Sequence, residues 1–343
     1  ARRCVPVGCR RARDLCWSAG SQLSLAAIAV DATLAAMSTG PIAAIAPSAA
    51  APAARSSRLL LALAAVYVIW GSTYLAMRVV VESMPPLGMG AARFTVAGAI
   101  LLVVARATGA AWPSRQQWLA ALPVGALLCV GGNGLVAIAE TQVSSGIAAL
   151  VCATMPLWMA VFATATGERP SGREWLGIGV GLGGVAILVG GAELAATPGA
   201  ALILCASPLC WALGSVLAKR LALAPGLAGA GSQMLLGGVC LLVTAAARGE
   251  GWPAHASARS LGALVYLLVA GSLIGFTAYA WLLRNARPAV ATSYAFVNPV
   301  LAVMLGVLLY DEPLTRPTLI AAPLVIAAVI LVIGGRRAPA AKA

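Results

Sequence analysis

The sequence predicts an all-α polytopic membrane protein with ten transmembrane helices in two inverted five-helix repeats. Three observations lead to this fold class: the composition, a series of apolar stretches of membrane length, and an internal repeat. Of the 343 residues, 61% are apolar and only 10% are charged, and the mean hydropathy is +0.94. Soluble domains carry about a quarter charged residues, so the composition excludes a water-soluble globular protein.

Apolar stretches long enough to cross a bilayer, which takes about 20 residues, follow one another from residue 59. Trp112, Trp118, Trp175 and Trp252 lie at their edges, as expected of an aromatic belt at the membrane surface. The ten predicted spans are Leu59–Val81, Leu87–Ala105, Trp118–Ala139, Gly146–Thr166, Trp175–Gly191, Pro198–Ala218, Gly226–Ala247, Leu261–Leu283, Ala289–Tyr310 and Leu314–Gly334.

The positive charges predict that both termini are cytoplasmic. With this orientation, only Arg78, Arg248, Arg259 and Arg316 lie on the outer side. Cytoplasmic loops carry the excess of Lys and Arg, and the 13 cations expected there from residue 55 onward are Arg55, Arg58, Arg106, Arg115, Arg169, Arg173, Lys219, Arg220, Arg284, Arg287, Arg336, Arg337 and Lys342. Because these cations stand singly or in pairs between apolar runs, the net charge of +13 gives no basic surface for nucleic acid.

The two halves of the chain repeat each other. Trp70 is matched by Trp211 and Pro156 by Pro299, at separations of 141 and 143 residues. Five helices are an odd number, so the second copy must enter the membrane upside down. Inverted repeats are typical of secondary transporters, whose substrate site lies between the copies near the bilayer midplane.

The paired prolines mark the most informative positions. Proline removes one helical hydrogen bond and crowds the carbonyl four residues earlier, here that of Cys152 and that of Ala295. Freed carbonyls at membrane depth are tolerated only against protein or a water-filled cavity. We therefore expect Pro156 and Pro299 to break their helices beside a cavity; a pair of purely structural kinks is the alternative.

Polar and aromatic residues within the spans predict the lining of that cavity. Tyr294 and Asn298 are four residues apart and share one helix face. Each such residue alone could serve only for packing or for a hydrogen bond between helices, but together they suit an amphipathic small molecule. The candidate substrate-binding residues are Trp70, Thr73, Asn133, Trp158, Trp211, Tyr279, Tyr294 and Asn298.

Two charged residues are candidates for proton coupling or for a structural charge. Arg93 lies well inside the second span, where an unpaired cation is costly, so it should face inward and pair with Glu82 or Glu140. Glu140, at the end of the third span, is the best-placed carboxylate for proton coupling. A solvated loop glutamate is the simpler expectation for it.

No catalytic, metal or cofactor site is predicted. The single histidine, His255, stands in a loop, and five of the eight cysteines lie inside apolar runs as expected core residues. No phosphate-binding loop is present. Glycines with small-xxx-small spacing in the fifth span, from Gly177 to Gly184, would allow close packing within the chain or a homodimer.

The chain divides into four predicted regions. Residues 1–57 are expected to be a disordered or even untranslated extension, with Met37 as the alternative start. Its run Leu23–Val30 resembles a signal-peptide core but is short. Residues 58–192 and 197–335 form the two repeats, and residues 336–343 form a basic cytoplasmic tail.

Several of these motifs resemble the drug/metabolite transporter superfamily of the EamA type. They cover residues 58 to 335 and comprise Trp70–Arg78, Ala92–Phe94, Gly146–Leu150, Pro156–Leu157, Glu168–Ser171, Glu174–Gly177, Ala291–Tyr294 and Asn298–Val300. The resemblance implies ten helices in two inverted repeats, with a central cavity between the first, third, fourth, sixth, eighth and ninth. The first helix of this sequence departs from the pattern of small multidrug-resistance relatives, because it lacks the acidic residue that they use for proton coupling.

The function expected from these features is secondary transport, not enzyme activity. We expect a bacterial inner-membrane exporter of small amphipathic metabolites, such as amino acids or drugs, that works by alternating access and needs no cofactor. Its expected partners are its substrate and the lipid bilayer. Transport of phosphorylated or sugar substrates, and a non-transporting membrane scaffold or receptor, are the alternatives.

Overall fold

The computed structural model describes residues 52–164, 171–195, 197–253, 255–285 and 294–335, and every regular element in them is a helix. The predicted extension before residue 52 and the tail 336–343 lie outside the described residues. The helices are α2 (Pro52–Val80), α3 (Pro86–Ala107), α4 (Arg115–Gly125), η1 (Ala126–Gly134), α5 (Leu135–Ala139), α6 (Ser145–Cys152), α7 (Met155–Thr164), α8 (Gly172–Val189), α9 (Ala192–Ala195), α10 (Pro198–Arg220), α11 (Gly226–Ala247), α12 (Ala258–Tyr266), η2 (Leu267–Ile274), α13 (Gly275–Asn285), α15 (Tyr294–Tyr310) and α16 (Arg316–Gly335).

These elements confirm the predicted membrane protein. Eight helical stretches in the described residues are long and apolar enough to span a bilayer, and the shorter apolar helices Val297–Tyr310 and Arg316–Leu331 fall in the ninth and tenth predicted spans. Three spans are composite: α4, η1 and α5 form the third, α6 and α7 the fourth, and α12, η2 and α13 the eighth.

Local sequence explains where several helices begin. Ser114 caps α4 by accepting from the Gln117 N–H, and its own N–H donates to Oε1 of Gln117. Ser171 and Glu174 make the same reciprocal capping box at the start of α8. Pro86 and Pro198 begin α3 and α10, at positions where no helical N–H is needed.

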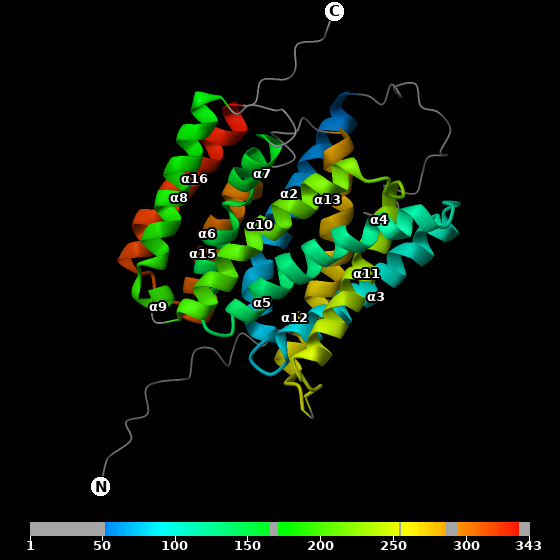
Figure 1. Cartoon of the computed structure of the whole chain (residues 1–343), viewed down its shortest axis with the longest axis horizontal. Coiled ribbons are helices and arrows are strands. Elements are labelled where there is room, and N and C mark those ends of the chain that lie inside the picture. Colours follow the sequence, from blue (N-terminus) through cyan, green and yellow to red (C-terminus); the bar gives the residue numbers. More distant parts are fainter. Residues whose placement is uncertain (1–51, 165–170, 196, 254, 286–293, 336–343) are drawn as a thin grey trace, which may run out of the picture. The chain divides into compact units, whose positions relative to one another are not determined.

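The helices pack with a two-fold pattern that relates the repeats. The second spans of each half, α3 and α11, run against each other, and so do the fifth spans, α8 and α16 (Figure 1). The first span α2 packs on α15 of the second half, just as its counterpart α10 packs on α6 and α7 of the first half. The interfaces between the halves are therefore formed by equivalent helices.

Two π-helical segments occupy equivalent places in the repeats. The segment η1 covers 126–134 in the third span and η2 covers 267–274 in the eighth. A π-helix shifts the hydrogen-bonding partners along the backbone and is frequent at functional sites. Each segment packs against the first span of the opposite half, η1 on α10 and η2 on α2.

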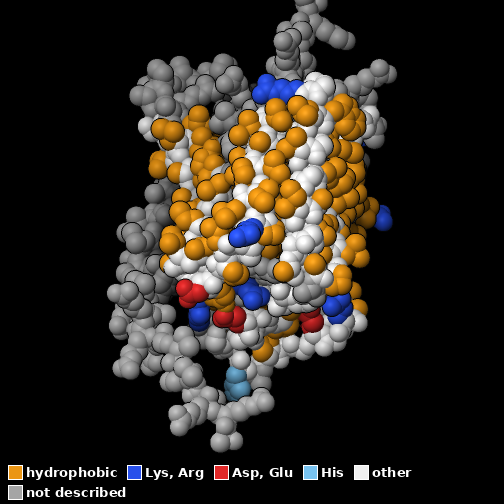
Figure 2. Space-filling view, turned by 90° about the vertical axis from the view of Figure 1, so that its left-hand side faces the viewer, with side chains coloured by type: hydrophobic (Ala, Val, Ile, Leu, Met, Phe, Trp, Pro, Cys, Tyr) orange, Lys and Arg blue, Asp and Glu red, His pale blue; other side chains and the backbone are white. Residues whose placement is uncertain are grey.

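The outward-facing helix surfaces are apolar. Leu61, Leu122, Leu242 and Leu308 are among many large apolar side chains that are exposed. Figure 2 shows such side chains over the middle of one face, with most charged side chains towards its ends. This distribution suits contact with lipid.

The small residues of α8 mainly serve packing within the chain. Added Cβ atoms would strike Leu157 and Ala328 at Gly181, and Val325 at Gly184, so these glycines admit α7 and α16. Gly179 and Gly183 face open space. Close intramolecular packing, one of the two roles expected for this stripe, is thus observed.

Candidate functional site

An aromatic cluster lies where α2, α13 and α15 meet. The Trp70 ring contacts Phe276, Tyr279 and Tyr294, with centroids 5.6, 5.0 and 5.1 Å away. Tyr279 and Tyr294 also meet edge to face at 5.6 Å. Three of these four contacts are edge-to-face, an arrangement that aromatic rings favour, so these residues form one continuous aromatic surface.

Five predicted binding residues belong to this same side-chain cluster. Trp158 and Trp211 pack into it from α7 and α10, beside Trp70, Tyr279 and Tyr294. The structure thus brings together aromatic residues from both halves of the sequence.

The two repeat-related tryptophans pack in equivalent ways. The Trp70 ring lies directly on Gly275, at the end of η2, and the Trp211 ring lies on Gly132 within η1. A Cβ atom on either glycine would come within 3.0 Å of the indole. A glycine within or directly after each π-helical segment therefore leaves room for a tryptophan ring from the other half.

Side chains also bind the carbonyls of the π-helical segments. Trp70 Nε1 donates to the Gly271 carbonyl at 3.2 Å, and Ser207 Oγ donates to the Gly132 carbonyl at 2.9 Å. Asn133 Nδ2 donates to the Leu128 carbonyl at 3.3 Å within its own segment. These hydrogen bonds satisfy backbone carbonyls inside the membrane. A carbonyl buried there without a donor would lower the stability of the fold.

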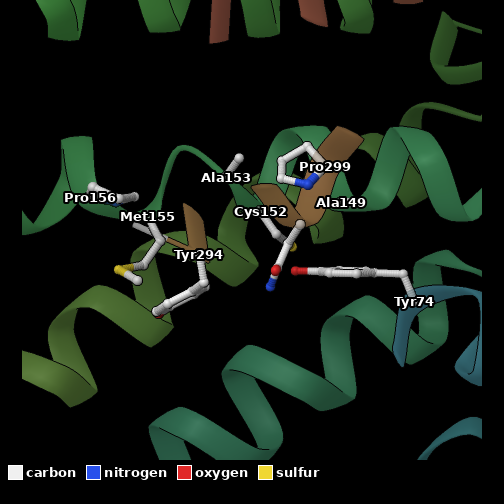
Figure 3. Close-up of a pocket in the computed structure, with 9 residues that line it drawn as sticks. Tyr74, Ala149, Cys152, Ala153, Met155, Pro156, Tyr294 and Pro299 are labelled. Atoms are coloured by element: carbon white, nitrogen blue, oxygen red, sulfur yellow. The ribbon is translucent and has the colours of Figure 1, made fainter. Parts of the chain in front are cut away.

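A small cavity lies beside the aromatic cluster, between α2, the α6–α7 junction and α15. Its volume is about 30 Å³, enough for one or two water molecules. Figure 3 shows Tyr74 reaching in from one side with its hydroxyl directed towards Cys152. The lining residues are Tyr74, Ala149, Cys152, Ala153, Met155, Pro156, Tyr294, Asn298 and Pro299.

Asn298 is the polar residue of this cavity with unmet bonding capacity. Its side chain is 6% exposed, and no described group donates a hydrogen bond to its Oδ1. A buried amide oxygen without a partner costs about 1–3 kcal/mol. The position is therefore suited to a donor on a ligand or to water.

The two prolines line the cavity as expected but differ in their helices. The helix before Pro156 is interrupted, because α6 ends at Cys152 and α7 begins at Met155. Pro299 lies inside the continuous helix α15. The helix break expected at Pro299 from symmetry is not observed, because α15 continues through the proline to Tyr310; the proline removes only its own helical N–H donor there.

Thr73 and Asn133 do not line this cavity. Thr73 is buried, and its hydroxyl donates to the Trp70 carbonyl at 2.7 Å. Asn133 is occupied by the bond within η1 described above. Conversely, Cys152, expected to be a core residue, lies in the cavity wall.

Arg93 is buried, as expected, but neither predicted glutamate is its partner. Its Nε donates to Ser272 Oγ of η2 at 2.8 Å, and its side chain is 4% exposed. Glu82 instead accepts a hydrogen bond from Tyr310 and lies 4.0 Å from Arg259. The pairing expected from sequence is wrong because Glu82 and Glu140 stand at the end of the bundle, whereas Arg93 faces the interface with η2.

One end of the bundle is held together by polar contacts between distant segments. We call it the Glu140 end; its described residues are 81–85, 140–144, 248–253, 255–257 and 311–315. Ser83 Oγ accepts from the Ser257 N–H at 3.0 Å, and Ser260 Oγ donates to the Val79 carbonyl at 2.8 Å. These contacts tie the two halves together across this end.

Two glutamates of this end cap helices of the other half. Glu250 accepts from the N–H groups of Leu87 and Gly88 at 3.0 and 3.1 Å, at the start of α3. Glu312 accepts from Ser145 and Gly146 at 2.8 and 3.1 Å, at the start of α6. Neither helix has a side-chain cap of its own, so these carboxylates satisfy helix N-termini that would otherwise lack acceptors.

Glu140 itself is fully buried, so the expectation of a solvated loop residue is wrong. Its side chain has 0% exposure. Burial, and secondly the neighbouring Glu312, raise the pKa of this carboxyl well above its usual range, while Arg78 acts in the opposite direction. The sequence places Glu140 at a span end, but in the folded chain Arg78 donates to its main-chain carbonyl and Glu312 lies near its carboxyl group.

Sequence reasoning missed the π-helical segments and the two capping glutamates. The sequence signal that could have indicated these caps is an acidic residue shortly before a proline in a loop, as at Glu250 and Glu312. No three His, Cys, Asp or Glu residues gather as a metal site within the described ranges.

Comparison with known proteins gives the family. The model of the EamA-like transporter family matches residues 57–190 and again 198–334. YedA, an uncharacterised inner-membrane transporter of Escherichia coli K12, is 42% identical over 276 residues, which cover 80% of this chain and 90% of YedA. The Streptantibioticus cattleyicolor protein named "Probable terminal-alkyne amino-acid exporter" is 28% identical over 284 residues, covering 80% of this chain and 93% of that protein.

A solved crystal structure supports the same fold. It superposes with a TM-score of 0.60 at 23% sequence identity, over 82% of this chain and 100% of the other chain. The two family matches, the similarity to YedA and the apolar helices together establish that the chain is a multi-pass inner-membrane transporter and belongs to the EamA-like transporter family.

Proposed function

We propose that the protein is a secondary exporter of small amphipathic metabolites that works by alternating access. The observation that best supports this proposal is the cavity beside Pro156 and Pro299. There Tyr74, Tyr294 and the Asn298 Oδ1 atom, which has no described hydrogen-bond partner, lie beside the aromatic surface. Aromatic faces with a few fixed polar groups suit molecules with an apolar body and a polar end. The amino-acid exporter among its relatives makes amino acids and their apolar derivatives the first candidates.

Alternating access is supported by the packing of equivalent helices. The cavity is too small for a metabolite in this conformation, because about 30 Å³ holds only water. Polar contacts between the halves close the Glu140 end over it. Substrate entry therefore requires the halves to move apart at one end, and the two-fold arrangement provides an equivalent movement at the other.

Phosphorylated substrates fit the cavity less well. Phosphate recognition uses clusters of Arg or Lys donors, and no Arg or Lys is among the described lining residues. On the charge distribution expected from sequence, the Glu140 end is periplasmic and both termini are cytoplasmic. Labelling of single cysteines placed in the loops of each end would test this orientation.

Flux measurements test the proposed function. Cells expressing the protein would be challenged with toxic analogues of amino acids and other amphipathic metabolites, and compounds that they resist would be loaded into proteoliposomes. We expect substrate-dependent efflux that Asn298→Leu abolishes at equal protein level. Absence of flux for a broad panel, or equal flux through Asn298→Leu, would contradict the proposal.

A further inference from the structure

The carboxyl group of Glu140 is buried without a hydrogen-bond partner. The residue ends α5 and is 0% exposed. Within the described residues, neither Oε1 nor Oε2 receives a hydrogen bond. An ionised carboxylate in such a place lacks both water and donors. The group is therefore stable in this conformation only with a proton bound.

The charged neighbours of Glu140 are engaged elsewhere. Arg78 of α2 donates to the main-chain carbonyl of Glu140 and not to its carboxylate. Glu312 uses one oxygen for the Ser145 N–H and the other for the Gly146 N–H. The hydroxyl of Ser145 is itself buried and without a partner. Two carboxyl groups and one arginine thus share the site, which favours one proton on the pair.

Further titratable groups lie towards the cavity. Tyr74 on α2 and Cys152 on α6 are close enough to interact electrostatically with Glu140. Cys205 of α10, a helix packed on α5, lies beside Cys152. With Arg78 and Glu312, these groups make up the described titratable surroundings of Glu140.

The elements around Glu140 also form the cavity wall. Tyr74 precedes Arg78 by four residues, about 6 Å along α2 at 1.5 Å per residue. Cys152 follows Ser145 by seven residues, about 10 Å along α6. A rearrangement at Glu140 would therefore move the same two helices that hold Tyr74 and Cys152 in the cavity.

We propose that Glu140 is a proton-binding site whose protonation state controls the opening and closing of the Glu140 end. This inference rests on the proposed secondary transport. The carboxyl group is protonated when the Glu140 end is closed; when the end opens, the proton passes to water and the carboxylate gains water and the Arg78 guanidinium as partners. No other bond forms or breaks. Because the closed conformation binds one more proton than the open one, acid favours closure and alkaline pH favours opening.

The surroundings favour a proton over a metal cation. Cations such as Na⁺ or Ca²⁺ require several oxygen ligands at once, and both oxygens of Glu312 are already taken by backbone N–H groups. Among the side chains described around Glu140, the Glu140 carboxyl and the Ser145 hydroxyl are the groups without a hydrogen-bond partner.

Carbodiimide labelling tests the protonation directly and needs no substrate. Dicyclohexylcarbodiimide reacts with protonated carboxyl groups in apolar surroundings, and mass spectrometry would locate the adduct. We expect Glu140 to be labelled at pH values where solvent-exposed carboxyl groups have lost their proton, with the labelled fraction falling as the pH rises further, in sodium-free and sodium-containing buffer alike. Glu250, whose ionised form accepts two N–H bonds, is the internal control and should stay unlabelled. An unlabelled Glu140, or protection by Na⁺, would overturn the proposal.

Accessibility of a buried reporter tests the coupling to opening. Val143 at the Glu140 end is 1% exposed, and Val143→Cys in a background without other cysteines would report its exposure to a water-soluble thiol reagent. The labelling rates of the chains with Glu140 and with Glu140→Gln are compared at the same pH. The effect of thiol ionisation on the rate is then the same in both chains. We expect several-fold faster labelling in the chain with Glu140 at alkaline pH, and no such pH-dependent difference near neutral or acid pH. Equal rates in both chains at every pH would overturn the proposal even if transport itself is demonstrated.

Discussion

The indole nitrogen of Trp70 donates a hydrogen bond to the carbonyl of Gly271, across 201 residues of sequence, and so joins the first span to the π-helical part of the eighth. The same ring lies on Gly275, one turn further on. A glycine at this place is required by the close approach of the ring. The first testable consequence concerns that approach.

Gly275→Ala should destabilise the protein by about 1–3 kcal/mol, the usual cost of forcing extra volume into a packed interior. The new methyl group would meet Trp70 Nε1 closer than real Cβ atoms come, so the indole must move and its bond to Gly271 weakens. Thermal unfolding in detergent measures the effect. The control is Gly262→Ala, on an open surface of α12, which should leave stability unchanged or slightly higher. Equal melting temperatures for the two variants would contradict the packing.

The spans were predictable from sequence because their ends carry local signals. The predicted seventh span, Gly226–Ala247, coincides with α11 at both ends. Pro225 precedes it, and Gly249 ends the turn after it with a φ of +69°, a conformation that favours glycine. The length of the apolar stretch and the Pro and Gly residues at its ends thus define where the helix begins and ends, without information on tertiary contacts.

The chemistry at the span ends was not predictable in the same way. The charged neighbours of the buried Glu140 are Arg78 and Glu312, which lie 62 and 172 positions away along the sequence. The partner of Arg93, Ser272, lies in a π-helical segment that no local pattern marks. Residue type and depth indicate that a charge needs a partner, but only the folded arrangement determines which one.

Arg93 provides the second prediction. Ser272→Ala removes the hydrogen bond to its Nε, and bonds to charged groups contribute about 1.5–3 kcal/mol. We expect a loss of that size in unfolding free energy, and Arg93→Ala should lower the folded yield as well as transport. The matched control is Ser215→Ala, whose hydroxyl bonds only to the Trp211 carbonyl of its own helix. If Arg93→Ala folds normally yet loses binding of an anionic substrate, Arg93 contacts substrate and its role is not structural.

The capping glutamates provide the third prediction. Glu250→Ala leaves the first N–H groups of α3 without their carboxylate, and charge-assisted bonds of this kind are the stronger ones. Thermal unfolding should show a loss of about 1–3 kcal/mol, with Glu250→Gln losing less because its amide oxygen still accepts. Hydrogen exchange at Leu87 and Gly88 should rise in the alanine variant. Unchanged exchange there would show that α3 does not depend on this cap.

The pH dependence of stability forms the fourth prediction. Burial raises the pKa of Glu140, just beyond the last residue of its span, above the value it has in an unfolded chain. Above the unfolded pKa, the unfolded state releases this proton while the folded state keeps it. Glu140 therefore lowers stability progressively as pH rises, until the folded pKa is passed. Glu140→Gln should melt at a higher temperature at neutral pH, with a flatter pH profile, and the two chains should converge in acid; a parallel pair of profiles would contradict the raised pKa.

The last prediction separates binding from packing at α15. Asn298→Leu replaces a buried amide whose Oδ1 has no described partner with an apolar side chain of similar size, so the folded yield should be unchanged or higher. Transport should be lost, because the polar group facing the cavity is gone. Tyr294→Phe keeps the ring that contacts Trp70 and Tyr279 and removes only the hydroxyl, so it should alter substrate preference more than stability.

Cysteine labelling provides the independent measurement for Asn298. In a background without other cysteines, Asn298→Cys should react with a small water-soluble reagent when the transporter opens, and substrate should slow the reaction. Val300→Cys, two residues further on, is the control, since that side chain is 53% exposed on the lipid-facing surface of the bundle and should not react with the water-soluble reagent, with or without substrate. If Asn298→Cys never reacts in a variant that transports normally, this face of α15 serves packing alone, since a binding residue must meet water at some stage of the transport cycle.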